Sequence, residues 1–404
     1  MHISKLSANV SSELSILVVP FLSLFLLALL MSTNSIGSSG IILVLIWILC
    51  RESEIRNHWW KVLSPWLIAV FIYFLAMTTY GFSKITTLRD GLEVLKGIAL
   101  SLVALYLLQL SDQQIRRVVG YVVFVLTVVT IGMLGFNLNQ HSVAQFIDNQ
   151  MFDWYVNRNR LAVGFSITSV FIAALMVDER TRWKSFLLSV AWILLASAAL
   201  LNGSRGATMG MIAATICIIL AGLFRVGWRQ VFRLEVWLIP ILIVLAGLGW
   251  VLYKHISFNQ YLMHDGKGVD TGRFEIWSGV GHRIIQAPWF GYGSHAMKFD
   301  PMVAAIRTKF GITHPHSIYV GLVYASGIIG VLFWLLWFTS FSYKIRQNFT
   351  TNNKLAYYIG VGLLVNILVH GFVDFDLYMF AIFSYITVGL VMMLSKKSHE
   401  GSRV

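Results

Sequence analysis

The chain has 404 residues, of which 57% are hydrophobic and only 12% are charged, and its formal net charge is +13 at pH 7. Soluble globular proteins carry about 25% charged residues, so this composition excludes an ordinary soluble enzyme and indicates an integral membrane protein. The apolar residues come in blocks of about 20, the length that an α-helix needs to cross a bilayer. Cys50 and Cys217 lie inside or at the end of such blocks, so no disulfide framework is indicated.

The apolar blocks, taken in chain order, predict an all-α polytopic bundle of about 12 transmembrane helices. The first block could pass for a signal peptide, but no small-x-small cleavage site follows it, so we count it as a helix. Residues 1–404 then form a single membrane domain, with one long connection at about 254–317. The predicted spans are 14–31, 36–50, 62–79, 92–110, 118–136, 160–177, 185–201, 207–224, 234–253, 318–340, 355–373 and 375–394.

The lysine and arginine residues indicate the orientation, because such residues concentrate in cytoplasmic loops. With the N-terminus inside, more than half of the 31 Lys and Arg residues fall in cytoplasmic segments, whereas the connections at 32–35 and 374 contain none. Both termini are therefore expected in the cytoplasm, and the 254–317 loop on the non-cytoplasmic side of the membrane. Topology and contact with anionic lipids explain the positive charge, so nucleic-acid binding is not expected.

A smaller group of basic residues is predicted on the outer side, against this rule. Those at helix ends can extend to the membrane interface as simple anchors. Arginine also binds phosphate bidentately, so the group suits a phosphate-bearing lipid. Its members are Lys84, Arg89, Lys96, Arg158, Arg160, Arg205, Lys254, Lys267, Arg273, Arg283, Lys298, Arg307 and Lys309.

The first motif is Asn202-Gly203-Ser204-Arg205-Gly206, between the spans at 185–201 and 207–224. Two glycines around Ser-Arg predict a tight turn followed by a helix N-terminus. Such a terminus favours anions through its free N–H groups and its dipole. Arg205 is therefore a candidate phosphate ligand, and its alternative role is an interfacial anchor.

The second motif begins at Asp270 and continues through Gly272-Arg273-Phe274-Glu275-Ile276-Trp277 in the long loop. Phe274, Trp277, Val280 and Ile284 recur at helical spacing, which predicts an amphipathic helix on the membrane surface. Thr271 can cap this helix. Arg273 then falls in its first turn, where a positive charge opposes the helix dipole. Such a local cost suggests a function, although an ordinary interfacial arginine is the alternative.

The third motif is Thr313-His314-Pro315-His316-Ser317, which opens the span at 318–340. Pro315 blocks helix continuation backwards, so His316 is expected in the first helical turn on the outer rim. His316 could be a general base, a phosphate ligand or a capping residue. His314 and His316 are not spaced i, i+4, which argues against a zinc site.

These three motifs, in this order, resemble the O-antigen ligase family. That family has a short Arg-containing turn ahead of a span, a Gly-Arg helix in a large periplasmic loop, and a His-Asn signature opening the next helix. Ser317 departs from the usual Asn. The resemblance implies a GT-C-like glycosyltransferase in the superfamily that also holds O-antigen polymerases and bacterial protein O-oligosaccharyltransferases. It implies a glycan on undecaprenyl diphosphate as donor, a sugar hydroxyl of lipid A-core as acceptor, and no cofactor.

The resemblance also implies roles for particular residues. Arg205 and Arg273 would stabilise the departing diphosphate, and His316 would act as a base on the acceptor hydroxyl or as a diphosphate ligand. Further contacts with substrate are expected from the remaining candidates: Arg89, Lys96, Arg158, Arg160, His314 and Asp374.

The acidic pair Asp374 and Asp376 could be a metal motif, but no second acidic pair accompanies it, so no metal site is expected. Pairing of Asp374 with an outward arginine or with His316 is the alternative. The competing functions are an O-antigen polymerase and a protein O-oligosaccharyltransferase that use the same donor. A transporter is a third possibility, disfavoured because the spans contain almost no central ionisable residues.

Overall fold

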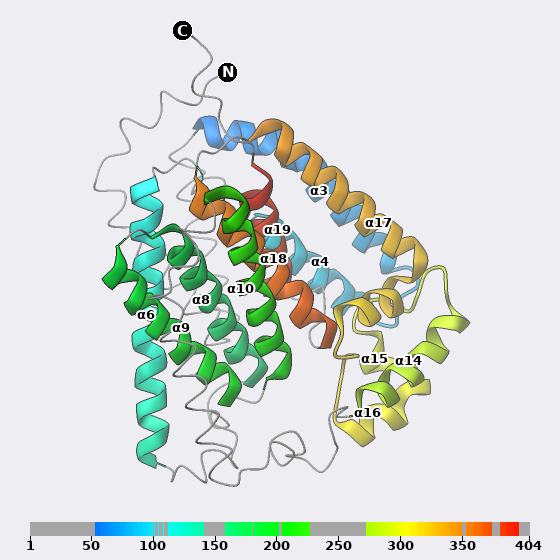
Figure 1. The fold of residues 1–404 in the computed structure, drawn as a ribbon. Coiled ribbons are helices and arrows are strands. Elements are labelled where there is room, and N and C mark those ends of the chain that lie inside the picture. Colours follow the sequence, from blue (N-terminus) through cyan, green and yellow to red (C-terminus); the bar gives the residue numbers. More distant parts are fainter. Residues whose placement is uncertain are drawn as a thin grey trace.

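A computed structural model describes residues 53–99, 101, 104, 108, 112–140, 158–179, 181–201, 204–226, 272–349, 353–373 and 380–395. Every regular element within these ranges is helical, as the sequence predicts (Figure 1). The predicted spans at 14–31, 36–50 and 234–253 lie outside the described residues. The helices are α3 (Ser53–Met77), α4 (Lys84–Ala99), α6 (Asp112–Gln140), α8 (Arg158–Asp178), α9 (Arg182–Leu201), α10 (Arg205–Val226), α14 (Arg273–Gln286), α15 (Ala296–Phe299), η2 (Pro301–Val303), α16 (Ala304–Phe310), α17 (Ile318–Asn348), α18 (Lys354–Val373) and α19 (Phe380–Leu394).

Four helices in this part of the chain are long and apolar enough to cross a membrane, and they include segments of α6, α10, α17 and α18. Shorter apolar helices occur within α3, α8, α9 and α19. The structure thus agrees with a polytopic membrane protein, while the full number of 12 spans stays a prediction. The predicted span at 92–110 overlaps α4 only partly, because α4 already begins at Lys84. Ser83 accounts for this start, since its carbonyl accepts the Thr87 N–H at 3.1 Å.

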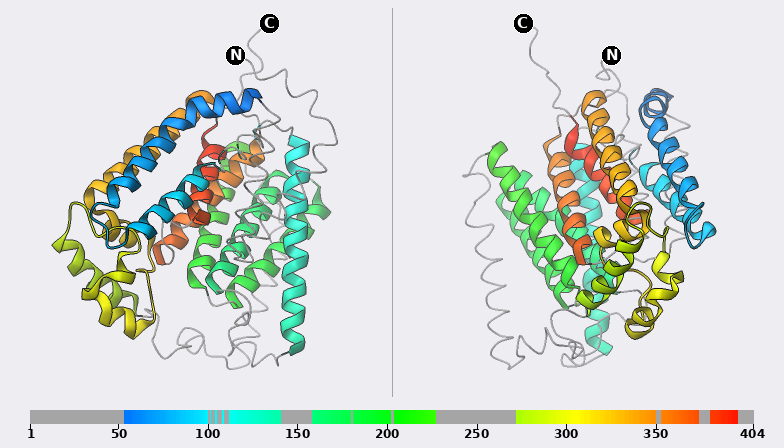
Figure 2. Two further views of the ribbon diagram at one scale, coloured as in Figure 1. Left: turned by 180° about the vertical axis from the view of Figure 1, so that it is seen from behind. Right: turned by 90° about the vertical axis from the view of Figure 1, so that its right-hand side faces the viewer.

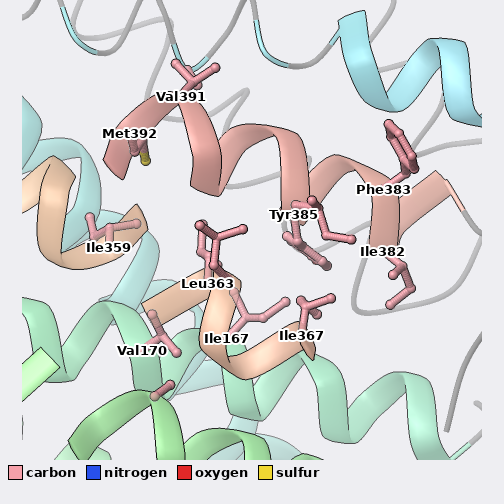
Figure 3. Packing of buried hydrophobic residues seen from close by; sticks show 14 of the residues in the cluster. Ile167, Val170, Ile359, Leu363, Ile367, Ile382, Phe383, Tyr385, Val391 and Met392 are labelled. Carbon is pink, nitrogen blue, oxygen red and sulfur yellow. The ribbon is translucent and has the colours of Figure 1, made fainter. Parts of the chain in front are cut away.

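Helix α18 lies between α8 and α10 on one side and α19 on the other (Figures 1 and 2). Figure 3 shows Ile359, Leu363 and Ile367 of α18 packed between side chains of α8 and α19. Glycines allow this close approach, because a Cβ added at Gly360 would lie 2.5 Å from the Met393 backbone nitrogen. Membrane helices commonly associate through such small residues, since lipid supplies no hydrophobic drive for helix pairing.

Helices α3 and α17 run side by side, joined by aromatic side chains (Figures 1 and 2). Tyr73 stacks on Phe333 with ring centroids 4.2 Å apart. Trp337 meets Trp66 edge to face at 6.3 Å and donates its indole N–H to the Trp66 carbonyl at 3.2 Å. Aromatic rings prefer edge and offset contacts of this kind, which stabilise the pairing beyond the contribution of the buried area.

Helix α17 is interrupted at Gly327, where φ is 59° and ψ is −166°. The backbone groups freed by this break bond to the segment 288–293 instead of to each other, which fixes the helices of the long loop on the bundle. Buried backbone groups need such partners, above all inside a membrane. The four hydrogen bonds are Tyr292 N–H to Tyr324 C=O (3.0 Å), Gly293 N–H to Ala325 C=O (2.7 Å), Ile328 N–H to Pro288 C=O (2.8 Å) and Ile329 N–H to Trp289 C=O (3.1 Å).

Arg116 and the start of α10 at Arg205, which the sequence assigns to opposite sides of the membrane, lie toward opposite ends of helix α8. Near the end where α8 and α10 begin and α18 finishes, Ser166 donates to the Ala207 carbonyl at 3.1 Å, and Asn366 donates to Ser166. At the other end of α8, Asp178 forms a 2.7 Å salt bridge with Arg116 near the start of α6. The positions of these two arginines agree with the predicted alternation, while the remaining loops and the compartment that each end faces stay predictions.

Candidate active site

The helices that carry the three sequence motifs meet at the C-terminal end of α18. We call the consecutive residues His370, Gly371 and Phe372, together with the residues they contact, the α18 junction. A Cβ added at Gly206 of α10 would lie 2.5 Å from the His370 ring, and one added at Gly371 would overlap the Ile318 side chain of α17. The ring of Phe372 meets Trp277 of α14 edge to face, with centroids 6.0 Å apart. Three motifs that are spread over residues 202–317 thus contact one short stretch of helix.

The first motif forms a helix start, as the sequence predicts. Arg205 is the first residue of α10, and the Ser204 carbonyl accepts the Thr208 N–H at 3.1 Å. Ser204 and Gly206 are both buried, so the turn is packed into the bundle. The structure describes the backbone of Arg205, whereas its side chain lies outside the described part. The positive end of the α10 dipole therefore lies beside His370 of the α18 junction.

The second motif forms helix α14, which begins at Arg273. Gly272 precedes it with φ 76° and no side-chain cap, whereas the sequence suggested Thr271, which lies outside the described residues. A side chain at position 272 would overlap the Phe310 ring, with 2.8 Å from an added Cβ to Cζ. A backbone with positive φ and no room for a Cβ explains a glycine here. Arg273 itself is half-buried.

The buried face of α14 differs slightly from the face that the sequence predicts. Ile276 and Val280 are the buried residues of this helix, and they pack with Met297 and Val303. Phe274, expected on that face, is 69% exposed. The helix therefore turns its buried face onto α15, η2 and α17, while Phe274 points away from that small core.

His316 lies just before helix α17, not in its first turn as the sequence suggested. Ser317 is the capping residue, since its hydroxyl accepts the Val320 N–H at 3.4 Å, and the helix begins at Ile318. His316 has a left-handed backbone with φ 52°. Its N–H donates to Nδ1 of His314 at 3.2 Å, and the two rings lie 4.1 Å apart. The capping serine and this turn leave the half-buried imidazole outside the helix.

The other predicted binding residues lie on α4, at the start of α8 and outside the described residues. Arg89 is exposed on α4, a helix that packs against α3 and α19. Lys96 forms a 2.9 Å salt bridge with Glu93, one turn earlier on the same helix. Arg158 and Arg160 lie in the first turn of α8, with side chains outside the described part. Asp374 follows α18 directly and lies outside the described residues.

A buried ion pair stabilises the helices of the long loop against the bundle. Asp300 is fully buried and accepts hydrogen bonds from Arg283 Nε at 2.9 Å and from the Tyr324 hydroxyl of α17 at 2.7 Å. Burial opposes ionisation of Asp300, but the hydrogen bonds from Arg283, Tyr324 and the Met302 amide outweigh it, so the pKa of Asp300 lies below its usual value. The carboxylate therefore joins α14 to α17 across the boundary of the loop.

Two residues of the α18 junction are absent from the sequence-based site. His370 is fully buried against Gly206. Histidine in an otherwise apolar span is costly and marks function by default, so this signal was available in the span at 355–373. Trp277 donates its indole N–H to the Pro315 carbonyl at 2.9 Å. No spacing rule connects residues 277 and 315, so only the fold shows this contact.

The described residues contain no group of three or more His, Cys, Asp or Glu side chains that could hold a metal ion. Asp374 and Asp376 lie outside them, so metal-independence stays a prediction.

Comparison with known proteins gives two matches, each to part of the chain. The O-antigen ligase family model matches residues 190–335, which include Arg205, Arg273 and His316. The O-antigen ligase of Pseudomonas aeruginosa is 30% identical over 165 residues, which cover 39% of this chain and 35% of that protein. The chain thus spans about a third of the length of this curated relative. Together the two matches confirm that this chain resembles the O-antigen ligase family.

Proposed function

We propose that this chain transfers a glycan from undecaprenyl diphosphate to a sugar hydroxyl of lipid A-core, at the periplasmic face of the bacterial inner membrane. The α18 junction is the observation that carries the proposal. It joins the starts of α10 and α17 to helix α14, so the elements with Arg205, Arg273 and His316 contact one stretch of α18. An enzyme that binds a diphosphate and activates a hydroxyl needs these residue types in one place.

In this reaction the acceptor hydroxyl oxygen bonds to the anomeric carbon of the glycan, and the bond from that carbon to the diphosphate oxygen breaks. Negative charge develops on the diphosphate as it leaves. Arg205 and Arg273 stabilise that charge, helped by the free N–H groups at the start of α10. Each charge-assisted hydrogen bond contributes about 1.5–3 kcal/mol, so two contribute roughly 10²–10⁴ in rate.

His316 has one of two roles in this proposal. As a base it takes the proton of the acceptor hydroxyl, a role worth roughly 10²–10⁴ in turnover. As a ligand it donates a hydrogen bond to the diphosphate. Its position outside the helix, directly before the capping Ser317, suits both roles because the imidazole is half-exposed.

The remaining basic residues extend the same surface for the donor. Arg158 and Arg160 begin α8 at the bundle end where α10 begins. Arg89 is exposed on α4, near Asp90, whose carboxylate contacts His295 of the long loop at 3.2 Å. We propose that these side chains bind phosphate or glycan, together with Asp374, which follows α18 in the sequence. Lys96 contributes less, because Glu93 already pairs with it.

A deletion strain tests the proposal, with its lipopolysaccharide separated on a gel. We expect loss of long glycan chains on lipid A-core and accumulation of the lipid-linked glycan, both reversed by the unmodified chain. Chains shortened to one repeat would instead identify a polymerase. Unchanged lipopolysaccharide with loss of a glycosylated periplasmic protein would identify a protein O-oligosaccharyltransferase.

A further inference from the structure

The backbone of His316 adopts a conformation that needs support from its surroundings. Its φ of 52° lies in the left-handed region, which costs a residue other than glycine about 1 kcal/mol or more. Among the described residues other than glycine, His295 also has a positive φ. Such conformations persist where neighbouring groups hold them and cluster at sites where geometry matters.

Two side chains hold this turn by hydrogen bonds, one on each side of the Pro315–His316 peptide. The His316 N–H donates to Nδ1 of His314 at 3.2 Å. The Pro315 carbonyl accepts the indole N–H of Trp277 at 2.9 Å. Since Nδ1 accepts, His314 carries its ring proton on Nε2. The first bond is local, whereas the second comes from a different helix.

Trp277 also connects His316 to the helix that carries Arg273. Arg273 and Trp277 are four residues apart on α14, so they lie on the same face of that helix. The Trp277 ring packs edge to face on Phe372 at 6.0 Å and on Phe274 at 5.8 Å, which fixes the direction of its N–H. One side chain therefore sets the position of α14 relative to the His316 turn.

We propose that Trp277 and His314 are positioning residues for His316. Trp277 fixes the peptide ahead of His316 from helix α14, and His314 fixes its backbone N–H, so the imidazole is held at a constant place relative to the helix that carries Arg273. This inference rests on the proposed function for the role of His316. It assigns His314 to the support of His316 rather than to substrate contact.

The test compares Trp277→Phe with the unmodified protein, purified in detergent with lipid-linked glycan and lipid A-core. Phenylalanine keeps a ring on Phe372 but has no N–H for the Pro315 carbonyl. We expect turnover to fall about tenfold to a hundredfold, as for a misplacement of about 1 Å. The affinity for the donor and the thermal unfolding midpoint should change little. Trp183→Phe is the control, because Trp183 is 61% exposed at the start of α9, away from the junction.

A pair of variants at position 314 separates positioning from substrate contact. Asparagine can accept a backbone N–H two residues ahead, as in an Asx turn. We therefore expect His314→Asn to recover most of the turnover that His314→Ala loses. Equal losses in both variants would show that the imidazole of His314 itself is needed, which would overturn its assignment.

A readout without substrate keeps this inference separate from the proposed function. The rate at which diethylpyrocarbonate modifies His316, followed by mass spectrometry, should change severalfold in Trp277→Phe and stay the same in Trp183→Phe. If the unmodified chain transfers no glycan but this rate changes, the positioning stands and the function fails. An unchanged rate together with full turnover in Trp277→Phe would overturn the positioning.

Discussion

His370 of α18 lies directly against Gly206 of α10, close enough that a Cβ at position 206 would come within 2.5 Å of the His370 Cδ2 atom. Gly206 follows Arg205, the first residue of α10, so the packing of one buried histidine sets the place of the arginine turn. His370 also precedes the two residues that contact α17 and α14. The absence of a side chain at position 206 is therefore a condition for the arrangement of the site.

Replacing Gly206 by alanine should shift the start of α10 away from α18. Overpacking a tight contact costs about 1–3 kcal/mol, and here the shift also moves Arg205. We expect Gly206→Ala to lower glycan transfer at least tenfold, with a modest loss of thermal stability. Gly120→Ala in α6 is the control, because nothing lies within 4 Å of a Cβ there. Equal activity of the two variants would contradict the tight contact.

The break in α17 predicts that Gly327 tolerates no side chain. A Cβ at Gly327 would lie 2.5 Å from the Trp289 carbonyl group, in addition to the strain of φ 59°. Gly311 has a similar φ of 63° but open space around its Cβ position, so it separates the two effects. We expect Gly311→Ala to cost about 1 kcal/mol, the price of the left-handed backbone, and Gly327→Ala clearly more. Thermal unfolding in detergent measures both, and equal losses would argue against the close packing of the segment 288–293.

The ion pair between Arg283 and Asp300 should dominate the stability of the loop helices. Replacing Asp300 by asparagine leaves Arg283 without its charged partner, and breaking a buried pair in this way costs roughly 3–5 kcal/mol. Glu275→Gln is the matched control, since the pair of Glu275 with Lys309 is exposed and worth about 0–1 kcal/mol. Chemical denaturation, followed by fluorescence, gives both values. Similar stabilities for the two variants would show that the buried pair contributes little.

The same carboxylate gives a pH dependence with a definite sign. The pKa of Asp300 is lower in the folded protein than in the unfolded chain, where an aspartate has a pKa of about 3.9. Its stabilisation is therefore complete above pH 4 and is lost as the pH falls through the folded pKa. We expect the unfolding midpoint of the unmodified chain to fall below pH 4 more steeply than that of Asp300→Asn. Parallel curves would contradict this assignment.

The predicted topology can be tested by labelling single cysteines in a background without Cys50 and Cys217. Position 278 is exposed on α14 and position 181 is exposed between α8 and α9. We expect an impermeant maleimide added to spheroplasts to label Ser278→Cys at once, and Thr181→Cys only after permeabilisation. The reverse result would place the α18 junction on the cytoplasmic side.

Much of the fold could be predicted from the sequence, because apolar blocks and helix-start signals are local features. The structure confirms that a helix starts at the Asn202–Gly206 motif and that Arg273 lies in the first turn of a helix, whereas the cap of α14 is Gly272 instead of Thr271. The predicted position of His316 in the first turn of α17 is wrong. The sequence suggests that the helix starts directly after Pro315, whereas Ser317 caps it and Ile318 is its first residue. The break at Gly327 depends on hydrogen bonds between residues 32 to 40 positions apart, which no local pattern contains.

The meeting of the three motifs at α18 could not be predicted, because it depends on how helices pack. Gly206, Gly371 and Trp277 carry no sequence signal for the partners that they contact. His370 did carry one, as an ionisable residue within an apolar span. The cost of burying a histidine in a membrane makes His370 a candidate functional residue from the sequence alone, whereas its contacts require the fold.

In the proposed function, Arg273 and Arg205 stabilise a lipid-linked diphosphate at the α18 junction. The most direct measurement uses purified protein, undecaprenyl-diphosphate-linked glycan and lipid A-core, and follows the product on a gel with and without a chelator. We expect activity in excess chelator. Arg273→Lys and Arg205→Lys should fail nearly as badly as the alanine variants, because lysine lacks the planar fork of donors. Arg117→Ala, exposed near the start of α6 at the opposite end of the bundle, should keep full activity. Full activity in Arg273→Ala or Arg205→Ala would contradict the account, as would activity that chelator abolishes and Mg²⁺ restores.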